Sequence, residues 1–236
     1  MSRSAAKEDD NSHRGQMLSS LKAILFLSIP TTLFIFLFKT PIARLFYMRG
    51  AFGERELSET VWAMSFYCVG IPFFCSVKIL ASAFHSRKDM KTPLKISLFC
   101  IFLNIMLNLV LMFKMKQGGI ALATSISSVA NCAIMMKILK IRDSNLKYSG
   151  LFSEIVRIAS AAIISSATAI VCYNKVLTNM NISSVFVAPD LMPLIISATI
   201  FSSVFIIMLH ILGSKTPDNL FQTAKSMLIK NNLNSK

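Results

Sequence analysis

The chain has 236 residues, with 25 lysines and arginines against 11 aspartates and glutamates, and a formal net charge of +14. Hydrophobic residues make up 54% of it and charged residues only 15%. Soluble domains carry about a quarter charged residues, so this chain has too few to cover a soluble globule. It is also too hydrophobic to be disordered. The composition therefore indicates a membrane protein whose basic residues lie in the loops between spans.

Six stretches without charged residues approach the roughly 20 apolar residues that a bilayer-crossing helix needs. Because backbone groups in lipid must bond internally, and no strand-like alternation is present, each is predicted to be a helix. We therefore expect an all-α polytopic membrane protein with six transmembrane helices, in which Pro30 and Pro193 kink or interrupt their helices. The six stretches are 23–38, 61–77, 96–113, 117–136, 158–174 and 191–213, and the first two extend past a lysine to Leu18 and Phe84.

The basic residues are shared unequally between the two sides of these spans. Seventeen lie on the side of the N-terminus and seven on the other, and Lys78 lies within a span. By the positive-inside rule, both termini are expected to face the cytoplasm. The expected divisions are a cytoplasmic segment 1–22, a four-helix part 23–140, a cytoplasmic loop 141–153, a final helix pair 154–213 and a cytoplasmic tail 214–236.

Polar groups inside the predicted spans are candidates for a functional site, because each is costly in lipid unless it has a partner or faces water. Lys78 has two interpretations: its long side chain reaches the cytoplasmic interface, or it lines a cavity and meets an anionic substrate. Asn104 and Asn108 are four residues apart and share a helix face, and Asn131 lies in the next span. These amides either hold helices together or bind a ligand, and both interpretations stay open.

No pattern in the sequence indicates catalysis, a metal or a cofactor. The five cysteines all fall inside apolar stretches, without disulfide or metal-ligand spacing, and the three histidines form no nucleophile–base pair. Small residues in the fourth and fifth spans are instead predicted to allow close helix packing. They are Ala121, Ala123, Ser125, Ser128 and the stretch 160–169.

Three stretches go beyond a generic membrane helix. They are FYMRGAF at 46–52, VKILASAFHSRKDMKTP at 77–93 and QGGIALATS at 117–125. Together they resemble the MurJ (MviN) family of lipid II flippases, in the multidrug/oligosaccharidyl-lipid/polysaccharide exporter superfamily. Members of that family carry an LF-x-x-G-x-F loop, a K-x-L segment before an FY-x-x-x-D-x-K-T-P loop, and an AGLALATS-like helix start. The resemblance covers about residues 1–140, and beyond them only length and hydropathy agree.

The resemblance implies a fourteen-helix transporter, rather than an enzyme, of which this chain is similar to helices nine to fourteen. Its implied activity is translocation of the undecaprenyl-linked peptidoglycan precursor across the bacterial inner membrane, and the final helix pair would line a groove for the lipid tail. Lys78 matches a family lysine and Thr92-Pro93 a family loop, and the resemblance implies that these positions act as structural or gating elements. The residues that match the family's loop motifs are Arg49, Gly50, Phe52, Asp89, Lys91, Thr92, Pro93 and Gly119.

The resemblance also implies that a large part of the flippase is missing. The family's cavity arginines, which would meet the pyrophosphate, lie mainly on the N-terminal lobe and the eighth helix, so this chain alone is not expected to move lipid. A split gene, a decayed gene and a truncated gene model each explain the length, and in the first case a separate chain supplies the N-terminal helices. The other expected partners are membrane lipids and the lipid-linked precursor.

Two other functions stay open. The chain could act as a membrane scaffold or assembly partner without transport, or belong to an exporter of another lipid-linked polysaccharide. Nucleic-acid binding is not expected, because no basic cluster forms a helix face or a known motif.

Overall fold

The computed structural model describes residues 2–143, 146, 148–179 and 191–213. Over these residues the chain is entirely helical, and six of its helices are long and apolar enough to cross a membrane, which confirms the predicted fold class. The helices are α1 (Ser2–Leu37), α2 (Lys39–Tyr47), α3 (Glu54–Ser86), α4 (Lys91–Met115), α5 (Gln117–Arg142), α6 (Ser149–Asn179) and α7 (Leu191–Ile211).

Three details differ from the prediction. The short helix α2 was not predicted, because its two basic residues excluded it from a search for charge-free stretches. Pro30 does not interrupt α1, which continues past it to Leu37, so of its two predicted effects only a kink remains. Pro193 lies in the first turn of α7, where a proline breaks no helical hydrogen bond, so it begins this helix rather than interrupting it. The expected tail 214–236 lies outside the described residues.

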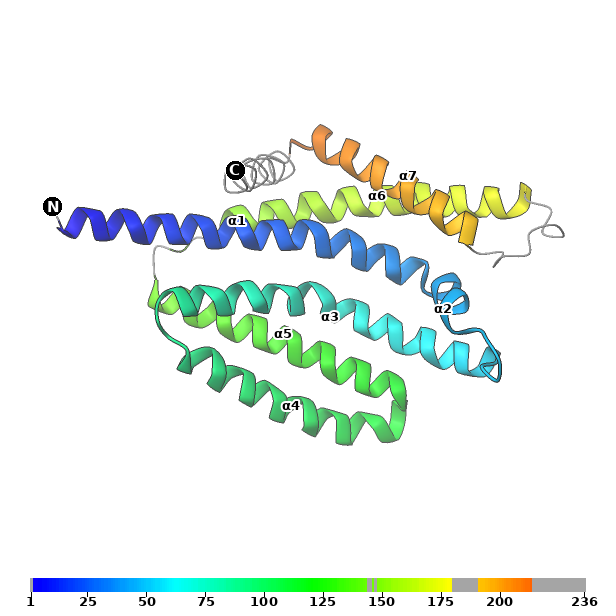
Figure 1. Cartoon of the computed structure of the whole chain (residues 1–236), viewed down its shortest axis with the longest axis horizontal. Coiled ribbons are helices and arrows are strands. Elements are labelled where there is room, and N and C mark those ends of the chain that lie inside the picture. Colours follow the sequence, from blue (N-terminus) through cyan, green and yellow to red (C-terminus); the bar gives the residue numbers. More distant parts are fainter. Residues whose placement is uncertain (1, 144–145, 147, 180–190, 214–236) are drawn as a thin grey trace, which may run out of the picture.

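The helices form two groups joined through α1 (Figure 1). In the first, which we call the α3–α5 group, α5 packs against both α3 and α4. In the second, the α1–α6–α7 group, α6 packs against α1 and α7, and α1 also packs against α3. The end of the bundle where α1 begins also holds the end of α3, the end of α5 and the start of α6 (Figure 1). We call it the N-terminal end, and it carries most of the basic loops.

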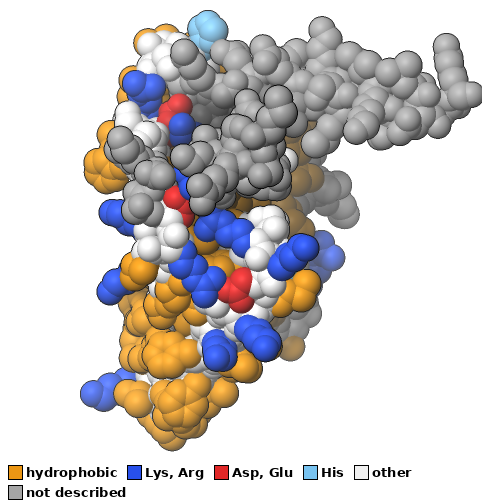
Figure 2. Space-filling view, turned by 90° about the vertical axis from the view of Figure 1, so that its left-hand side faces the viewer, with side chains coloured by type: hydrophobic (Ala, Val, Ile, Leu, Met, Phe, Trp, Pro, Cys, Tyr) orange, Lys and Arg blue, Asp and Glu red, His pale blue; other side chains and the backbone are white. Residues whose placement is uncertain are grey.

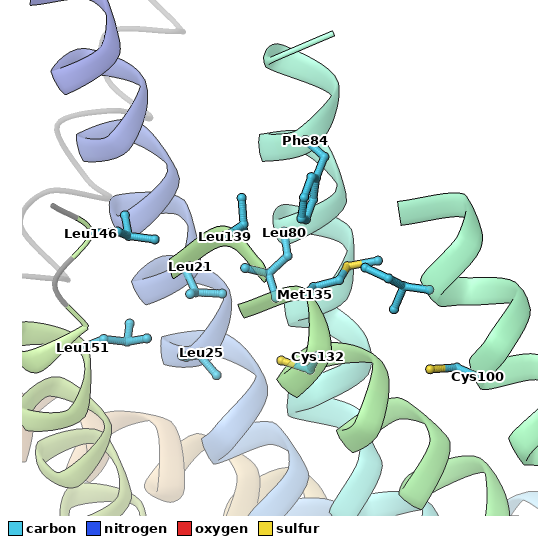
Figure 3. Packing of buried hydrophobic residues seen from close by; sticks show 11 residues of the cluster. Leu21, Leu25, Leu80, Phe84, Cys100, Cys132, Met135, Leu139, Leu146 and Leu151 are labelled. Carbon is cyan, nitrogen blue, oxygen red and sulfur yellow. The ribbon is translucent and has the colours of Figure 1, made fainter. Parts of the chain in front are cut away.

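A cluster of buried leucines and larger residues joins the two groups near the N-terminal end (Figure 3). Leu21 of α1 lies there among Leu80 and Phe84 of α3 and Met135 and Leu139 of α5, and none of these side chains is more than 1% exposed. Such packing is the main attraction between helices in a membrane, where burial from water contributes little. This cluster therefore determines how α1 sits on the α3–α5 group.

Aromatic side chains close the α1–α6–α7 group. The ring centroids of Phe26 in α1 and Phe205 in α7 are 5.6 Å apart, and those of Phe34 and Phe201 are 5.3 Å apart. Of the stretch 160–169, predicted to pack closely in α6, the small residues on one face do so, whereas Ala167 and Thr168 are exposed. The buried ones are Ala161, Ala162, Ser165, Ser166 and Ala169. Buried serines of α6 and α7 donate to carbonyls of their own helix, such as that of Ala161 four residues before Ser165. Their hydroxyls therefore need no other partner, whereas that of the buried Ser28 in α1 has none among the described residues.

Small residues also bring α3 and α5 together. Ser125 of α5 is buried and its hydroxyl donates to the carbonyl oxygen of Phe66 in α3, at 2.6 Å. A methyl group added at Gly70 would lie 2.9 Å from the Cα of Ser125, so no larger residue fits there without separating the helices. Ala121 and Ala123 are fully buried, as the close-packing prediction requires.

Candidate functional site

A cavity of about 360 Å³ lies between α3, α4 and α5. All three helices are apolar enough to span a membrane, yet the cavity walls carry hydroxyl and amide groups. α3 contributes Phe74 and Val77 to it. The polar lining comes from α4 and α5, and consists of Ser97, Asn104, Thr124, Ser127, Ser128 and Asn131. Two of the asparagines predicted as candidates, Asn104 and Asn131, therefore face one cavity.

A second hollow of about 220 Å³ adjoins this cavity, because both are lined by Phe74, Thr124 and Ser128. It continues between α3 and α5 along Tyr67 and Gly70. We call the two hollows together the polar groove. The groove therefore runs along the contact between α3 and α5, and α4 forms one side of it.

A chain of hydrogen bonds crosses from α4 to α5 beside the groove. Asn108 donates to the side-chain oxygen of Asn104 at 2.9 Å, and Asn104 donates to the hydroxyl of Thr124 at 3.4 Å. Thr124 in turn donates to the carbonyl oxygen of Ile120. The third predicted asparagine thus reaches the groove only through Asn104.

Two amide oxygens here have no hydrogen-bond partner among the described residues. They are the side-chain oxygens of Asn108 and Asn131, and both are buried. Asn131 is partly exposed as a residue and makes no hydrogen bond through either end of its amide to the described part of the chain. An amide left unpaired in an apolar medium costs about 1–3 kcal/mol, so this site is incomplete as it stands.

Lys78 lies at the rim of the groove rather than inside it. Its side chain is exposed, and its Nζ is 5.2 Å from the ring centroid of Phe74, which lines both hollows. None of the described acidic residues forms an ion pair with it. The structure therefore places a positive charge one helical turn from the polar groove, on the same side of α3 as Phe74.

The N-terminal end holds a second polar cluster, which we call the ionic cluster. The carboxylate of Asp143, which is 6% exposed, lies 2.5 Å from Nε of Arg14 and 2.9 Å from Nη2 of Arg87. These three residues come from the end of α5, from α1 and from the turn after α3. Figure 2 looks onto this end and shows lysines and arginines gathered around a few acidic side chains. One signal in the sequence points to this cluster: with only 11 acidic residues against 25 basic ones, each acidic residue has several possible basic partners.

The predicted loop residues Asp89 and Thr92 join this cluster at the turn between α3 and α4. Asp89 accepts a hydrogen bond from the backbone N–H of Thr92 at 3.0 Å and forms an ion pair with Arg142 of α5. Arg142 also donates to the Thr92 hydroxyl at 2.9 Å and lies over the ring of Phe84. The Thr92 hydroxyl and then the Arg142 guanidinium hold the pKa of Asp89 well below its usual range. Of the neighbouring loop residues, Pro93 is buried and Lys91 is exposed.

Tyr148, the residue before α6, lies next to the ionic cluster, near Arg87 and Asp143. Its hydroxyl donates to the carbonyl oxygen of Met136 at 3.2 Å, and burial raises its pKa to about 12. The tyrosine therefore stays neutral and ties the start of α6 to α5. Neither Tyr148 nor Asp143 was among the predicted functional residues.

The remaining predicted loop residues lie at the opposite end of the bundle. Arg49 and Gly50 are exposed in the turn between α2 and α3, where Gly50 has a φ of +61°, and Phe52 is half-buried. Gly119 begins α5 against α4, and a methyl group there would lie 2.4 Å from the carbonyl oxygen of Leu111. These positions shape turns and helix contacts and do not line the polar groove. Over the described residues, no group of acidic, histidine and cysteine side chains could hold a metal ion.

Comparisons with known proteins agree with the sequence resemblance and extend it. A family model described as lipid II flippase MurJ matches residues 1–196, beyond the 1–140 of the motifs. The probable lipid II flippase MurJ of Rickettsia prowazekii is 38% identical over 117 residues, which are 50% of this chain and 23% of that protein. The lipid II flippase MurJ of Thermosipho africanus is 33% identical over 110 residues, 47% of this chain and 23% of that protein.

The fold agrees as well. A solved structure titled lipid II flippase MurJ, inward closed conformation, superposes with a TM-score of 0.69 over 87% of this chain and 40% of that chain, at 23% identity. The chain thus spans less than half of the solved flippase and about a quarter of the two curated relatives named above. Because the family model covers most of the sequence, the chain belongs to the lipid II flippase MurJ family.

Proposed function

We propose that this chain is the C-terminal portion of a lipid II flippase, which translocates the undecaprenyl-linked peptidoglycan precursor across the bacterial inner membrane. The family match over residues 1–196 carries this proposal. Because the chain spans only 23% of the Rickettsia relative, it works together with the helices that precede this portion in its relatives. Both termini face the cytoplasm in this proposal, which the excess of basic residues at the N-terminal end supports.

The contacts within this portion support a mainly structural role, in which it holds helices of the flippase in place. The ionic cluster ties α1, α3 and α5 together at the end we assign to the cytoplasm. Lys78 lies within α3 at the rim of the polar groove, so it is the candidate contact for the anionic precursor. Its lysine ammonium would pair with a phosphate oxygen as a point charge.

A specific observation favours a second candidate function. The residues that line the polar groove are neutral, so the groove offers hydrogen bonds but no positive charge of its own to a pyrophosphate. A membrane scaffold or assembly partner that does not transport would have such an interior. Transport of another lipid-linked polysaccharide is a further alternative within the same superfamily.

Complementation in two pieces tests the proposal. The chain is produced together with the part of the Rickettsia prowazekii flippase that precedes the matched residues, in a bacterium depleted of its own flippase. We expect growth and precursor translocation with both pieces and with neither piece alone. Growth failure and precursor accumulation, despite membrane insertion of both pieces, would favour the scaffold function.

The role of Lys78 is tested in the same cells. Replacement by methionine keeps the length of the side chain but removes its charge, so Lys78→Met should lower translocation about tenfold if the ammonium contacts the precursor. Lys95→Met, at the start of α4, is the matched control and should transport normally. Unchanged transport by Lys78→Met would show that the lysine only reaches for the interface.

A further inference from the structure

The motif at 46–52 belongs to neither the polar groove nor the ionic cluster, although it carries three large exposed side chains in a row. Phe46 and Tyr47, the last residues of α2, are 67% and 55% exposed, and Met48 after them is 38% exposed. We call these three residues the α2 tip. Contiguous apolar side chains are costly in water, so an exposed run of this kind marks a surface that something covers.

The turn after α2 holds these side chains together. Gly50 has a φ of +61°, which lets the chain reverse its direction, and the backbone N–H of Phe52 donates to the carbonyl oxygen of Arg49 at 3.2 Å. The ring centroids of Tyr47 and Phe52 lie 5.9 Å apart, so the two sides of the turn meet through their aromatic rings. The motif therefore builds a compact aromatic surface at the end of α2.

The other face of α2 holds the helix on the bundle. Ile42 and Leu45 pack against the buried cluster that Phe38 forms with residues of α6 and α7. Lys39 donates to the hydroxyl of Ser65 in α3 at 2.7 Å. Because α2 contacts both helix groups in this way, the level of its tip relative to the spans is fixed.

Two features place α2 at the edge of the bilayer. α7 has 21 residues and no lysine, arginine or acidic residue, and at about 1.5 Å per residue it matches the roughly 30 Å of hydrocarbon, so its start at Leu191 marks a boundary. Leu194, one turn further, belongs to the cluster on which α2 packs, and Figure 1 shows α2 at the same end of the bundle as the start of α7. Trp62 at this end is 53% exposed and lies against Gly118, where α5 begins.

The side chains around the α2 tip have the chemistry of such an edge. Tyrosine and tryptophan gather at membrane–water interfaces because their rings are apolar and their polar groups stay in contact with water. Basic residues beside them attract the phosphates of lipid headgroups. Arg44 pairs with Glu54 at 3.5 Å, whereas Arg49 is exposed and forms no ion pair with a described acidic residue. Its guanidinium is therefore free to meet a phosphate.

We propose that α2 and the turn after it form an interfacial anchor, which inserts Phe46, Tyr47 and Met48 into the headgroup region on the side of the membrane opposite the N-terminal end. The phospholipid surface is the ligand: the tip enters the boundary between headgroups and acyl chains, and Arg49 meets a phosphate. Because α2 connects α1 to α3, the anchor sets the depth of both spans. The inference goes beyond the proposed function, since a flippase and a scaffold would use the anchor equally.

Fluorescence tests the anchor in the full chain, because Trp62 is its only tryptophan. In a Trp62→Phe background, Phe46→Trp and Tyr47→Trp each place one indole at the tip, and either variant suffices if the other fails to fold. The chain is reconstituted into phosphatidylethanolamine and phosphatidylglycerol vesicles that contain a lipid brominated either near the headgroup or near the acyl-chain end. The shallow bromine should quench both probes about twofold more strongly than the deep one, since interfacial side chains lie about 5–10 Å below the surface.

A matched control and a disrupting change accompany the probes. Phe102→Trp in the same background lies halfway along α4 at an exposed position, and the deep bromine should quench it more strongly than the shallow one. Phe46→Asp, combined with the Tyr47→Trp probe, adds a charge that disfavours insertion. It should weaken quenching by the shallow lipid and strengthen quenching by iodide in the water. Circular dichroism shows whether each variant keeps its helices.

The outcomes separate the anchor from its alternatives. Quenching of the tip probes by iodide alone, or more strongly by the deep bromine than by the shallow one, would overturn the anchor. Loss of lipid quenching when the chain is co-produced with the preceding part of the Rickettsia prowazekii flippase would also overturn it, because a protein surface would then cover the tip. Shallow quenching that persists in this pair supports the anchor whether or not the pair translocates the precursor, so failure of the proposed function stays distinguishable.

Discussion

The two helix groups of this chain differ in the kind of polar side chain that they leave without a partner. In the α1–α6–α7 group, buried serines such as Ser165 and Ser197 donate to their own helix, and aromatic rings close the remaining contacts. In the α3–α5 group, amides and hydroxyls line an open groove, and two amide oxygens have no partner among the described residues. The first group is not free of unpaired polar atoms, since the buried hydroxyls of Ser28 and Thr32 in α1 have no partner among the described residues, but only the second group leaves amides unpaired.

The N-terminal end sharpens the contrast between the groups. Charged residues there pair across the chain, since Asp143 bridges Arg14 and Arg87 and Asp89 pairs with Arg142. Charged groups at this end are thus paired within the chain, whereas beside the polar groove the side-chain oxygens of Asn108 and Asn131 have no partner among the described residues. Such an oxygen is costly in lipid, which offers it no hydrogen bond.

The largest expected effect comes from removing one aromatic ring from the packing of the α1–α6–α7 group. Phe205 of α7 is 6% exposed and packs against Phe26 of α1 and Phe201, so Phe205→Ala should lower the free energy of unfolding by about 3 kcal/mol. Denaturation in detergent, followed by circular dichroism, measures it. Phe99→Ala on the exposed face of α4 is the control and should change stability little. Equal losses at the two positions would contradict the contrast between a closed and an open group.

A smaller loss is expected in the ionic cluster. Asp143→Asn leaves Arg14 and Arg87 facing each other without their shared carboxylate, and because both arginines are partly exposed we expect a loss of about 2 kcal/mol. The same unfolding measurement applies. Glu59→Gln at the opposite end, whose ion pairs with Arg55 and Lys116 are 3.8 and 3.7 Å long, should cost much less. A stability unchanged by Asp143→Asn would show that the cluster does not hold the helices together.

The smallest effect concerns Asp89 and depends on pH. Because its pKa in the folded chain lies below the ordinary value of about 3.9, its contribution is fully present above that value and is lost as the pH falls further. The melting temperature of Asp89→Asn should therefore lie slightly below that of the unaltered chain by a constant amount from pH 5 to 8. The difference should shrink only below about pH 4. Glu54→Gln, an exposed acid at the start of α3, is the control.

Much of the fold could be predicted because hydropathy is a local property. All six predicted spans lie in long helices, and the close-packing interpretation of Ala121, Ala123 and Ser125 is confirmed by their burial. The structure also explains the glycine at position 119 of the motif 117–125, because its backbone lies too close to Leu111 for any side chain. The short helix α2 escaped prediction because nine residues with two basic side chains carry no span signal.

The candidate site could be predicted only in its parts. Asn104 and Asn131 were predicted from their position inside spans, but nothing in the sequence places them in one cavity with Thr124 and Ser127. The sequence likewise left Lys78 between two roles, and the structure puts it at the rim of that cavity. Such placements depend on which faces of α3, α4 and α5 meet.

The sequence by itself determined the membrane class, the number of spans and the family, because apolar length, charge and motif spacing are read along the chain. Only the tertiary structure decided that Asp143 meets Arg14 from 129 positions earlier, and that the asparagines border a groove. Contacts between distant segments depend on how side chains of several helices fit together in three dimensions. That fit leaves the side-chain oxygens of Asn108 and Asn131 without partners among the described residues, which no reading of single spans could reveal.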